Sequence, residues 1–108
     1  MGRWIYDDSQ SEHYTIDDRT LMHLKLAIGT KFRRLESFLF TLHGPELPSG
    51  KGQRVFWMDP AVPIEFQFDS PESTLRLNLQ WVDALVTAAS SEGGLRIVPE
   101  PEPSARKT

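Results

Sequence analysis

The residue types that carry chemistry in this chain do not occur in the spacing of a known catalytic motif. Ser11, Glu12 and His13 are residue types that hydrolases use, but neighbours on a strand point to opposite faces, so Glu12 and His13 do not converge. The Asp7-Asp8 and Asp17-Asp18 pairs are typical of turns and helix caps. The chain has no Gly-x-Ser-x-Gly elbow and no cysteine. We therefore predict no catalytic residue and a protein that is not an enzyme.

The sequence also lacks the residue spacing of a metal site or of a phosphate-binding loop. His13, His23 and His43 include no pair with the i, i+4 spacing of a zinc site, so we interpret them as structural or surface histidines. Gly50-Lys51-Gly52 resembles part of a phosphate loop, but Gly44 precedes Gly50 by one residue too many, and Gly52 stands where Ser or Thr is needed. We predict a flexible hairpin loop there, and neither a metal nor a cofactor.

Charge is segregated along the chain. Residues 1–18, 19–58 and 59–108 carry net charges of −4, +5 and −4, which together give −3. A basic middle segment is compatible either with an anionic partner or with an ordinary solvated surface. If the loop folds near the end of the first helix, five cations form one patch for phosphate backbones, with weak and salt-dependent binding. These candidate nucleic-acid contacts are Lys31, Arg33, Arg34, Lys51 and Arg54.

Hydrophobic periodicity predicts an α+β fold with the element order ββαβββα. Leucine and other apolar residues recur every three or four positions over 21–35, the stripe of an amphipathic helix that Asp17 or Asp18 caps. A second helix follows Asn78 as its cap and ends at Gly93-Gly94. Strands are predicted at 3–6, 12–16, 37–43, 54–58 and 63–69. We expect one antiparallel sheet of about five strands with two helices on one face.

Length and composition fit one small domain. The chain has 108 residues, of which 39% are hydrophobic and 25% charged. We assign residues 1–98 to a single α+β domain, with a short extended piece at 95–98, and 99–108 to a disordered Pro/Glu-rich tail. No run approaches the ~18 apolar residues of a membrane span, and charged residues stand where a signal peptide needs an apolar segment. We expect a cytoplasmic protein without a membrane partner.

The middle strands carry large apolar residues on both faces. Phe38, Phe40 and Leu42 alternate with Leu39, Thr41 and His43, and Val55 and Trp57 alternate with Phe56 and Met58. With two helices on one side of the sheet, the other side is left to solvent, to the 98–99 segment or to a partner. The candidate interface residues are Leu39, His43, Phe56 and Met58.

Six segments together form a recognisable pattern. They are Met-Gly-x-x-x-Tyr at 1–6, Asp-Asp-Arg-Thr-Leu-x-His-Leu at 17–24, Lys-x-Arg-Arg-x-Glu-Ser-Phe at 31–38, Trp-x-Asp-Pro-x-x-Pro at 57–63, Asn-x-x-Trp-Val-x-Ala-Leu at 78–85 and Gly-Gly-Leu-Arg-x-Val-Pro-Glu-Pro at 93–101. In these segments, and so over nearly the whole chain, the sequence resembles a family of small, uncharacterised actinobacterial proteins that often carry the automatic label "ATP-dependent DNA ligase".

The residues do not support the ligase label. A nucleotide-dependent ligase needs a lysine nucleophile in a Lys-x-Asp-Gly context, because the lysine amine takes up the adenylyl group. None of Lys25, Lys31, Lys51 and Lys107 has that context.

The leading hypothesis is therefore a non-enzymatic interaction module that binds a protein partner or forms a homo-oligomer. One alternative is a weak nucleic-acid-binding accessory protein that uses the basic segment 19–54. Another is a divergent fragment related to a DNA ligase without its adenylation motif.

Overall fold

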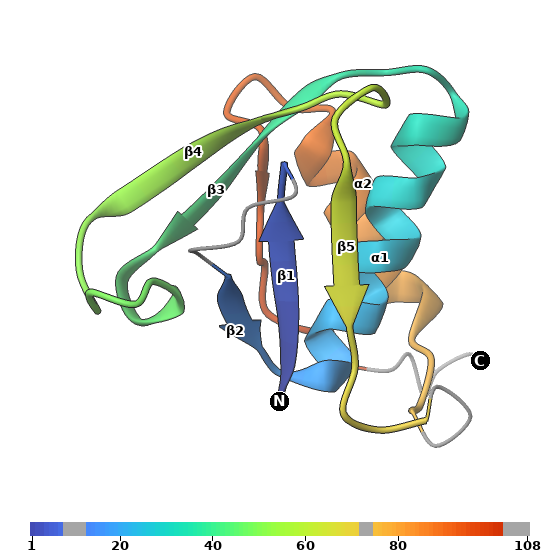
Figure 1. Cartoon of the computed structure of the whole chain (residues 1–108). Coiled ribbons are helices and arrows are strands. Elements are labelled where there is room, and N and C mark those ends of the chain that lie inside the picture. Colours follow the sequence, from blue (N-terminus) through green and yellow to red (C-terminus); the bar gives the residue numbers. More distant parts are fainter. Residues whose placement is uncertain (8–12, 72–74, 103–108) are drawn as a thin grey trace.

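The computed structural model describes residues 1–7, 13–71 and 75–102, which form two helices and two three-stranded sheets (Figure 1). The predicted α+β class is confirmed, and the predicted elements occur in the expected order, followed by one more short strand. The elements are β1 (Gly2–Tyr6), β2 (Tyr14–Ile16), α1 (Asp18–Arg33), β3 (Phe38–His43), the 3₁₀ turn η1 (Gly44–Glu46), β4 (Gln53–Met58), β5 (Ile64–Gln67), α2 (Leu79–Ala89) and β6 (Leu95–Arg96).

The expectation of one five-stranded sheet is wrong, because the strands divide between two sheets. One is antiparallel with the order β2-β1-β5, and the other has the order β4-β3-β6 with β6 parallel to β3. The segment after β4 turns at Asp59, whose carbonyl accepts from the Val62 N–H at 2.9 Å. The chain then meets β1, where the Asp7 N–H donates to Pro63 O at 2.8 Å. Strand β5 therefore continues beside β1 instead of β4.

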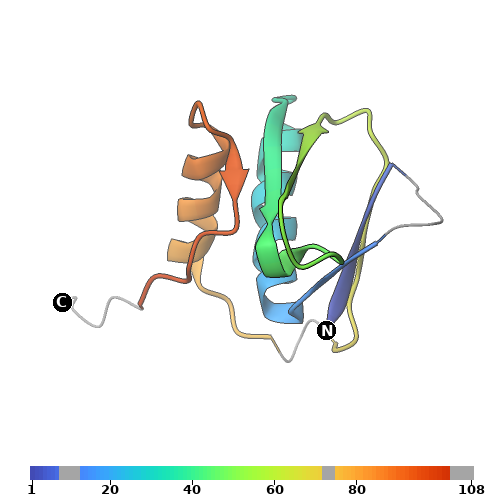
Figure 2. The ribbon, with the colours of Figure 1, turned by 90° about the vertical axis from the view of Figure 1, so that its left-hand side faces the viewer.

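The helices begin where the sequence predicts. The Asp17 carboxylate accepts from the Thr20 N–H at the start of α1, and the Asn78 side chain accepts from the N–H groups of Gln80 and Trp81 at the start of α2. Figure 2 shows β1, β2 and β5 on one side of the molecule and α2 with β6 on the other, with α1 and β3 between them. No helix in the described ranges is long and apolar enough to cross a membrane.

Trp4 joins the two sheets at the centre of the core. Its side chain is fully buried, and its ring meets Phe40 and Phe56 edge-on, with centroids 5.1 and 4.9 Å away. Phe40 lies on β3 and Phe56 on β4, so one residue of β1 packs against both strands of the opposite hairpin. Edge-to-face aromatic contacts of this kind stabilise beyond the area that they bury.

Strand β6 approaches β3 closely because the turn before it contains glycine. Gly94 has a φ of +82°, and a Cβ atom there would lie 2.7 Å from Leu39 O. After the turn, Leu95 is fully buried and pairs with Phe40. A side chain at position 94 would collide with the β3 backbone, so glycine is required for this approach.

The first part of the predicted tail contacts the rest of the protein. Residues 97–102 follow β6 as an extended segment, here called the strap. Val98 O accepts from the indole N–H of Trp81, and Glu100 pairs with Arg19. The remainder of the predicted tail, 103–108, lies outside the described residues.

Candidate interaction surfaces

The five predicted phosphate-binding cations do not form one patch. Lys31 is buried, with 7% of its side chain exposed, and its Nζ lies 2.7 Å from Glu36 Oε1 and 2.9 Å from Ser90 Oγ. The hydrogen bond from Lys31 holds the pKa of Glu36 below its ordinary value. A buried, paired ammonium is not available to a phosphate backbone, so Lys31 has a structural role.

The remaining cations lie at opposite ends of the β3–β4 hairpin. Arg33 and Arg34 are exposed at the end of α1, just before β3 begins, whereas Lys51 and Arg54 lie around the loop between β3 and β4. Figure 1 places this loop away from the end of α1. A six-residue hairpin separates its two ends by roughly 17 Å at the usual rise per residue.

The candidate interface residues divide between the two faces of the same hairpin. Phe38 lies opposite Met58 and Phe40 opposite Phe56, so these side chains share one face. That face is the core: Met58 is fully buried and Phe56 partly buried. Met58 therefore has no surface for a partner, which corrects the prediction. Leu39 and His43 are exposed, as the prediction requires, but they lie on the other face.

The outer face of the hairpin carries three exposed apolar side chains, Leu39, Val55 and Trp57, here called the hairpin face. Their exposed fractions are 38%, 52% and 57%. Leu39 lies directly opposite Trp57, and Val55 is two positions before Trp57 on β4. Three neighbouring apolar side chains at these exposures form a surface suited to association.

A hollow of about 490 Å³ adjoins the hairpin face. Leu39 and Trp57 contribute its apolar wall, and its polar wall comes from the ends of both helices, including Arg34, Ser90 and Glu92. Alternation along the sequence identified the apolar residues of β4. The prediction grouped Phe56 and Met58 with Leu39, whereas Val55 and Trp57 share its face. The register between β3 and β4, which is set by the loop, decides which side chains share a face.

The free edge of β4 lies beside the hairpin face. Gly44 N–H donates to Gly52 O at 2.9 Å, which fixes even-numbered residues as the hydrogen-bonded positions between β3 and β4. The backbone groups of Gln53, Val55 and Trp57 therefore point away from β3. Within the described chain β4 has no second strand partner, although Trp57 O accepts from the Tyr6 hydroxyl.

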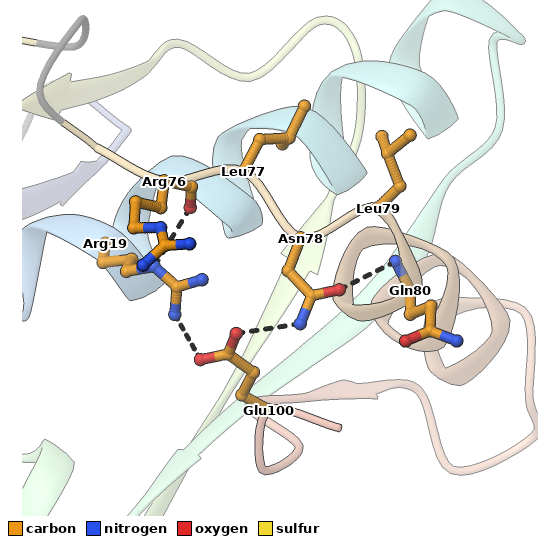
Figure 3. Close-up of a pocket in the computed structure, with 7 residues that line it drawn as sticks. All are labelled: Arg19, Arg76, Leu77, Asn78, Leu79, Gln80 and Glu100. Carbon is orange, nitrogen blue, oxygen red and sulfur yellow. Dashed lines mark hydrogen bonds and ion pairs between the residues drawn. The ribbon is translucent and has the colours of Figure 1, made fainter. Parts of the chain in front are cut away.

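The second candidate surface lies where the strap crosses the start of α2 (Figure 3). Arg19 donates to Glu100 Oε1, and Asn78 Nδ2 donates to Glu100 Oε2 at 2.8 Å. Asn78 Nδ2 also donates to Pro101 O at 3.2 Å, and Trp81 Nε1 donates to Val98 O at 3.0 Å. We call Arg19, Asn78 and Trp81 the strap site.

Hydrogen bonding sets the charge of Glu100. The bond from Arg19 is the largest cause and the bond from Asn78 the second, and together they lower the pKa of Glu100 from 4.5 to about 2. The Glu100 carboxylate therefore stays ionised well below pH 4.5. Arg19 is itself held in place, since its Nε donates to Arg76 O at 3.0 Å and its guanidinium lies 5.6 Å from the centroid of the Trp81 ring.

The side chain of His23 hydrogen-bonds the backbone of two residues of the strap site, Arg19 and Asn78. This side chain is fully buried; its Nδ1 lies 2.7 Å from Arg19 O, and its Nε2 accepts from the Asn78 N–H at 2.8 Å. These partners assign the proton to Nδ1, which donates to the carbonyl. The His23 ring also stacks on Trp81 with centroids 4.5 Å apart. His23 thus ties the start of α1 to the start of α2.

A hollow of about 670 Å³ opens beside Glu100. Exposed Arg76, Leu77 and Leu79 line it together with Gln80 and the pairing residues. Sequence reasoning missed this site, because Arg19 was grouped with the general basic segment and Glu100 with the tail. Prolines on both sides of Glu100 were the available signal, since they favour an extended conformation without demanding N–H partners.

Metal-binding geometry does not arise among the residues that the structure describes: no group of three or more His, Asp or Glu side chains comes together. Both candidate surfaces are instead suited to binding. The hairpin face offers apolar area beside an edge of β4 that has no second strand partner among the described residues. The strap site offers fixed hydrogen-bond donors for a carboxylate and for main-chain carbonyls.

Comparison with known proteins gives one match. The model of a family described as "Domain of unknown function (DUF7882)" matches residues 1–100. No curated protein and no solved structure matches the chain. The predicted resemblance to an uncharacterised family is confirmed at that level. Because the match covers nearly all 108 residues, the chain belongs to the DUF7882 family.

Proposed function

We propose that this protein is a non-enzymatic interaction module that self-associates through the hairpin face and the free edge of β4. The observation that carries the proposal is the exposed set Leu39, Val55 and Trp57 beside an edge of β4 that pairs with no second strand in the described chain. An exposed strand edge is a template for pairing with another chain. We further propose a cytoplasmic location, in line with the actinobacterial family that the sequence resembles.

The sequence of β4 is complementary to itself in an antiparallel arrangement. Pairing two copies about Val55 places Val55 opposite Val55, Gln53 opposite Trp57 and Lys51 opposite Asp59. The last pair is a favourable charge contact, and the twofold symmetry forms it twice. The backbone groups that such pairing uses are those of the odd-numbered residues, which already point away from β3.

Nucleic-acid binding is the weaker alternative. Lys31 is withdrawn into its pair with Glu36, and the other cations are divided between the two ends of the hairpin. A ligase-related activity has no supporting feature, since no lysine has the Lys-x-Asp-Gly context.

Sedimentation equilibrium of the full chain tests the proposal. The wild type should approach twice the 12.3 kDa protomer mass as its concentration rises. Val55→Lys should weaken association by at least about tenfold, since it removes apolar area and places like charges opposite each other at the twofold axis. Thr15→Lys is the matched control: Thr15 is an exposed β-branched residue on β2, an edge strand of the other sheet.

The control variant should associate like the wild type. A wild type that stays monomeric at millimolar concentration, or equal weakening by Val55→Lys and Thr15→Lys, would show that β4 is not the interface.

A further inference from the structure

We propose that the strap site is a peptide-binding site, occupied in this structure by the chain's own strap, and that it accepts an extended Pro-Glu-Pro segment from a partner protein. The site lies at the starts of α1 and α2 and does not involve the hairpin face, so the proposal is independent of self-association. The ligand class is an extended peptide whose glutamate is flanked by prolines.

The way in which the strap is bound is the first argument. Up to Arg96 the chain is held by backbone pairing, since β6 pairs with β3. Beyond it, among the described residues, the hydrogen bonds that hold the strap come from side chains: Trp81 to Val98 O, Asn78 to Pro101 O, and Arg19 and Asn78 to the Glu100 carboxylate. Ile97 and Val98 at its start also pack against the core. Domains that bind extended peptides hold them in this manner: side chains hydrogen-bond the carbonyls of the peptide, and one charged residue of the peptide anchors it.

The second argument is that the site is preorganised by the rest of the fold. Arg19 is oriented by Arg76 O and by the Trp81 ring, and Asn78 by its capping bonds to α2. Buried His23 locks the backbone beneath both residues. None of these contacts involves the strap. The donors therefore keep their positions when the strap leaves, so that an incoming carboxylate meets a site that is already formed.

Proline specificity follows from the hydrogen bonds. Pro99 and Pro101 have no N–H groups, so an extended Pro-Glu-Pro segment presents chiefly acceptors, namely its carbonyls and the carboxylate. The side-chain groups through which the strap site holds the strap are all donors: a guanidinium, an amide NH₂ and an indole N–H. Donors and acceptors thus match along the segment, and prolines also reduce the entropy that an extended ligand loses on binding.

The hollow beside Glu100 leaves room for a ligand that extends further than the strap. It has a volume of about 670 Å³, and it adds a second guanidinium, Arg76, and the exposed Leu77 and Leu79 to the walls. A partner peptide with an acidic and an apolar residue next to the Pro-Glu-Pro core would gain contacts that the strap does not make.

Competition with the strap sets the conditions of the test. Because the strap is tethered, its effective concentration is in the millimolar range, and it leaves the site open in only a small fraction of molecules. The apparent affinity of a free peptide for the wild type is the intrinsic affinity multiplied by that fraction. The full chain with Pro99→Gly, Glu100→Gly and Pro101→Gly opens the site without changing Arg19, Asn78 or Trp81.

Peptide titration followed by NMR provides the experiment. The probe is a capped peptide with the sequence of residues 97–102, Ile-Val-Pro-Glu-Pro-Glu, added to the ¹⁵N-labelled triple-glycine chain. We expect saturable shifts of the Asn78 side-chain amide, whose bond to the Glu100 carboxylate the variant removes, with affinity at least about tenfold higher than for wild type. A peptide with Gln in place of the first Glu should bind at least about tenfold more weakly, since it lacks the charge-assisted bonds.

Two controls make the result decisive. Arg19→Gln in the same triple-glycine background should discriminate much less between the Glu and Gln peptides, because it removes the carboxylate's main partner while Asn78 remains. Acetate alone should not saturate the site. The proposal is overturned if the folded triple-glycine chain, checked by its dispersed spectrum, shows no saturable shift, if it binds both peptides equally, or if acetate reproduces the shifts, which would indicate a simple anion site.

Discussion

The guanidinium of Arg19 donates to the carboxylate of Glu100, eighty-one positions later in the chain. The contact ties the first turn of α1 to the strap, and Asn78 at the start of α2 completes it. Three segments that are far apart in the sequence thus meet at one carboxylate. Both candidate surfaces of this protein depend on such long-range contacts.

Acid should release the strap. The pKa of Glu100 lies at about 2 in the folded chain, below its ordinary value of 4.5, because Arg19 and then Asn78 hydrogen-bond the ionised form. A carboxylate with a lowered folded pKa stabilises above its unfolded pKa, and the contribution is lost as the pH falls through the folded pKa. We expect the strap to stay bound above pH 4.5 and to detach between pH 4.5 and 2, as followed by the ¹³C carboxyl shift of Glu100.

The Arg19→Gln variant is the control for this titration. It removes the largest cause of the shift while Asn78 remains, so the pKa of Glu100 should rise part of the way toward 4.5. Detachment should then be complete at a higher pH than in the wild type. A Glu100 titration that is identical in the variant and the wild type would contradict the assignment of the ion pair.

Removing the His23 ring should destabilise the fold strongly. His23→Ala leaves the Asn78 N–H and Arg19 O without their partner and opens a cavity beside Trp81. We expect the free energy of unfolding to fall by about 2–4 kcal/mol in urea denaturation. His43→Ala, at an exposed position, should change it by less than about 0.5 kcal/mol. Equal effects of the two substitutions would show that His23 does not hold the helices together.

Truncating two neighbouring residues of β4 should lower the free energy of unfolding by very different amounts, because their side chains lie on opposite faces. Met58 is fully buried, so Met58→Ala should lower the free energy of unfolding by about 2–5 kcal/mol. Trp57 is 57% exposed, and Trp57→Ala should cost less than about 1 kcal/mol when measured in dilute solution, where self-association is negligible. A larger loss at Trp57 than at Met58 would reverse the face assignment of β4.

The divided cations should limit binding to duplex DNA. At most Arg33 and Arg34 act together, so the log–log salt slope should be no steeper than about −1.8, from roughly −0.9 per phosphate. Filter binding at several salt concentrations measures it. A slope of about −2.7 or steeper that also depends on Lys51 would show that the two ends of the hairpin contact one duplex, as the sequence alone predicted.

The sequence by itself determined the local structure of this protein. Helical spacing identified α1 and α2, and Asp17 and Asn78 cap them as predicted, because a cap depends on residues within one turn. Alternation and turn residues identified strands β1 to β5.

Tertiary structure decided which strands pair and which faces are exposed. Strand β1 pairs with β5 more than fifty residues away, and the alternation within each strand carries no information on its partner. Phe56 and Met58 were assigned to the surface because a single strand shows that its faces differ but not which one is buried; the register with Phe38 and Phe40 decides that. The place of Glu100 in a site likewise depends on contacts with residues far away in the sequence. A carboxylate between prolines is locally a solvated residue, and only the folded chain brings Arg19 and Asn78 to it.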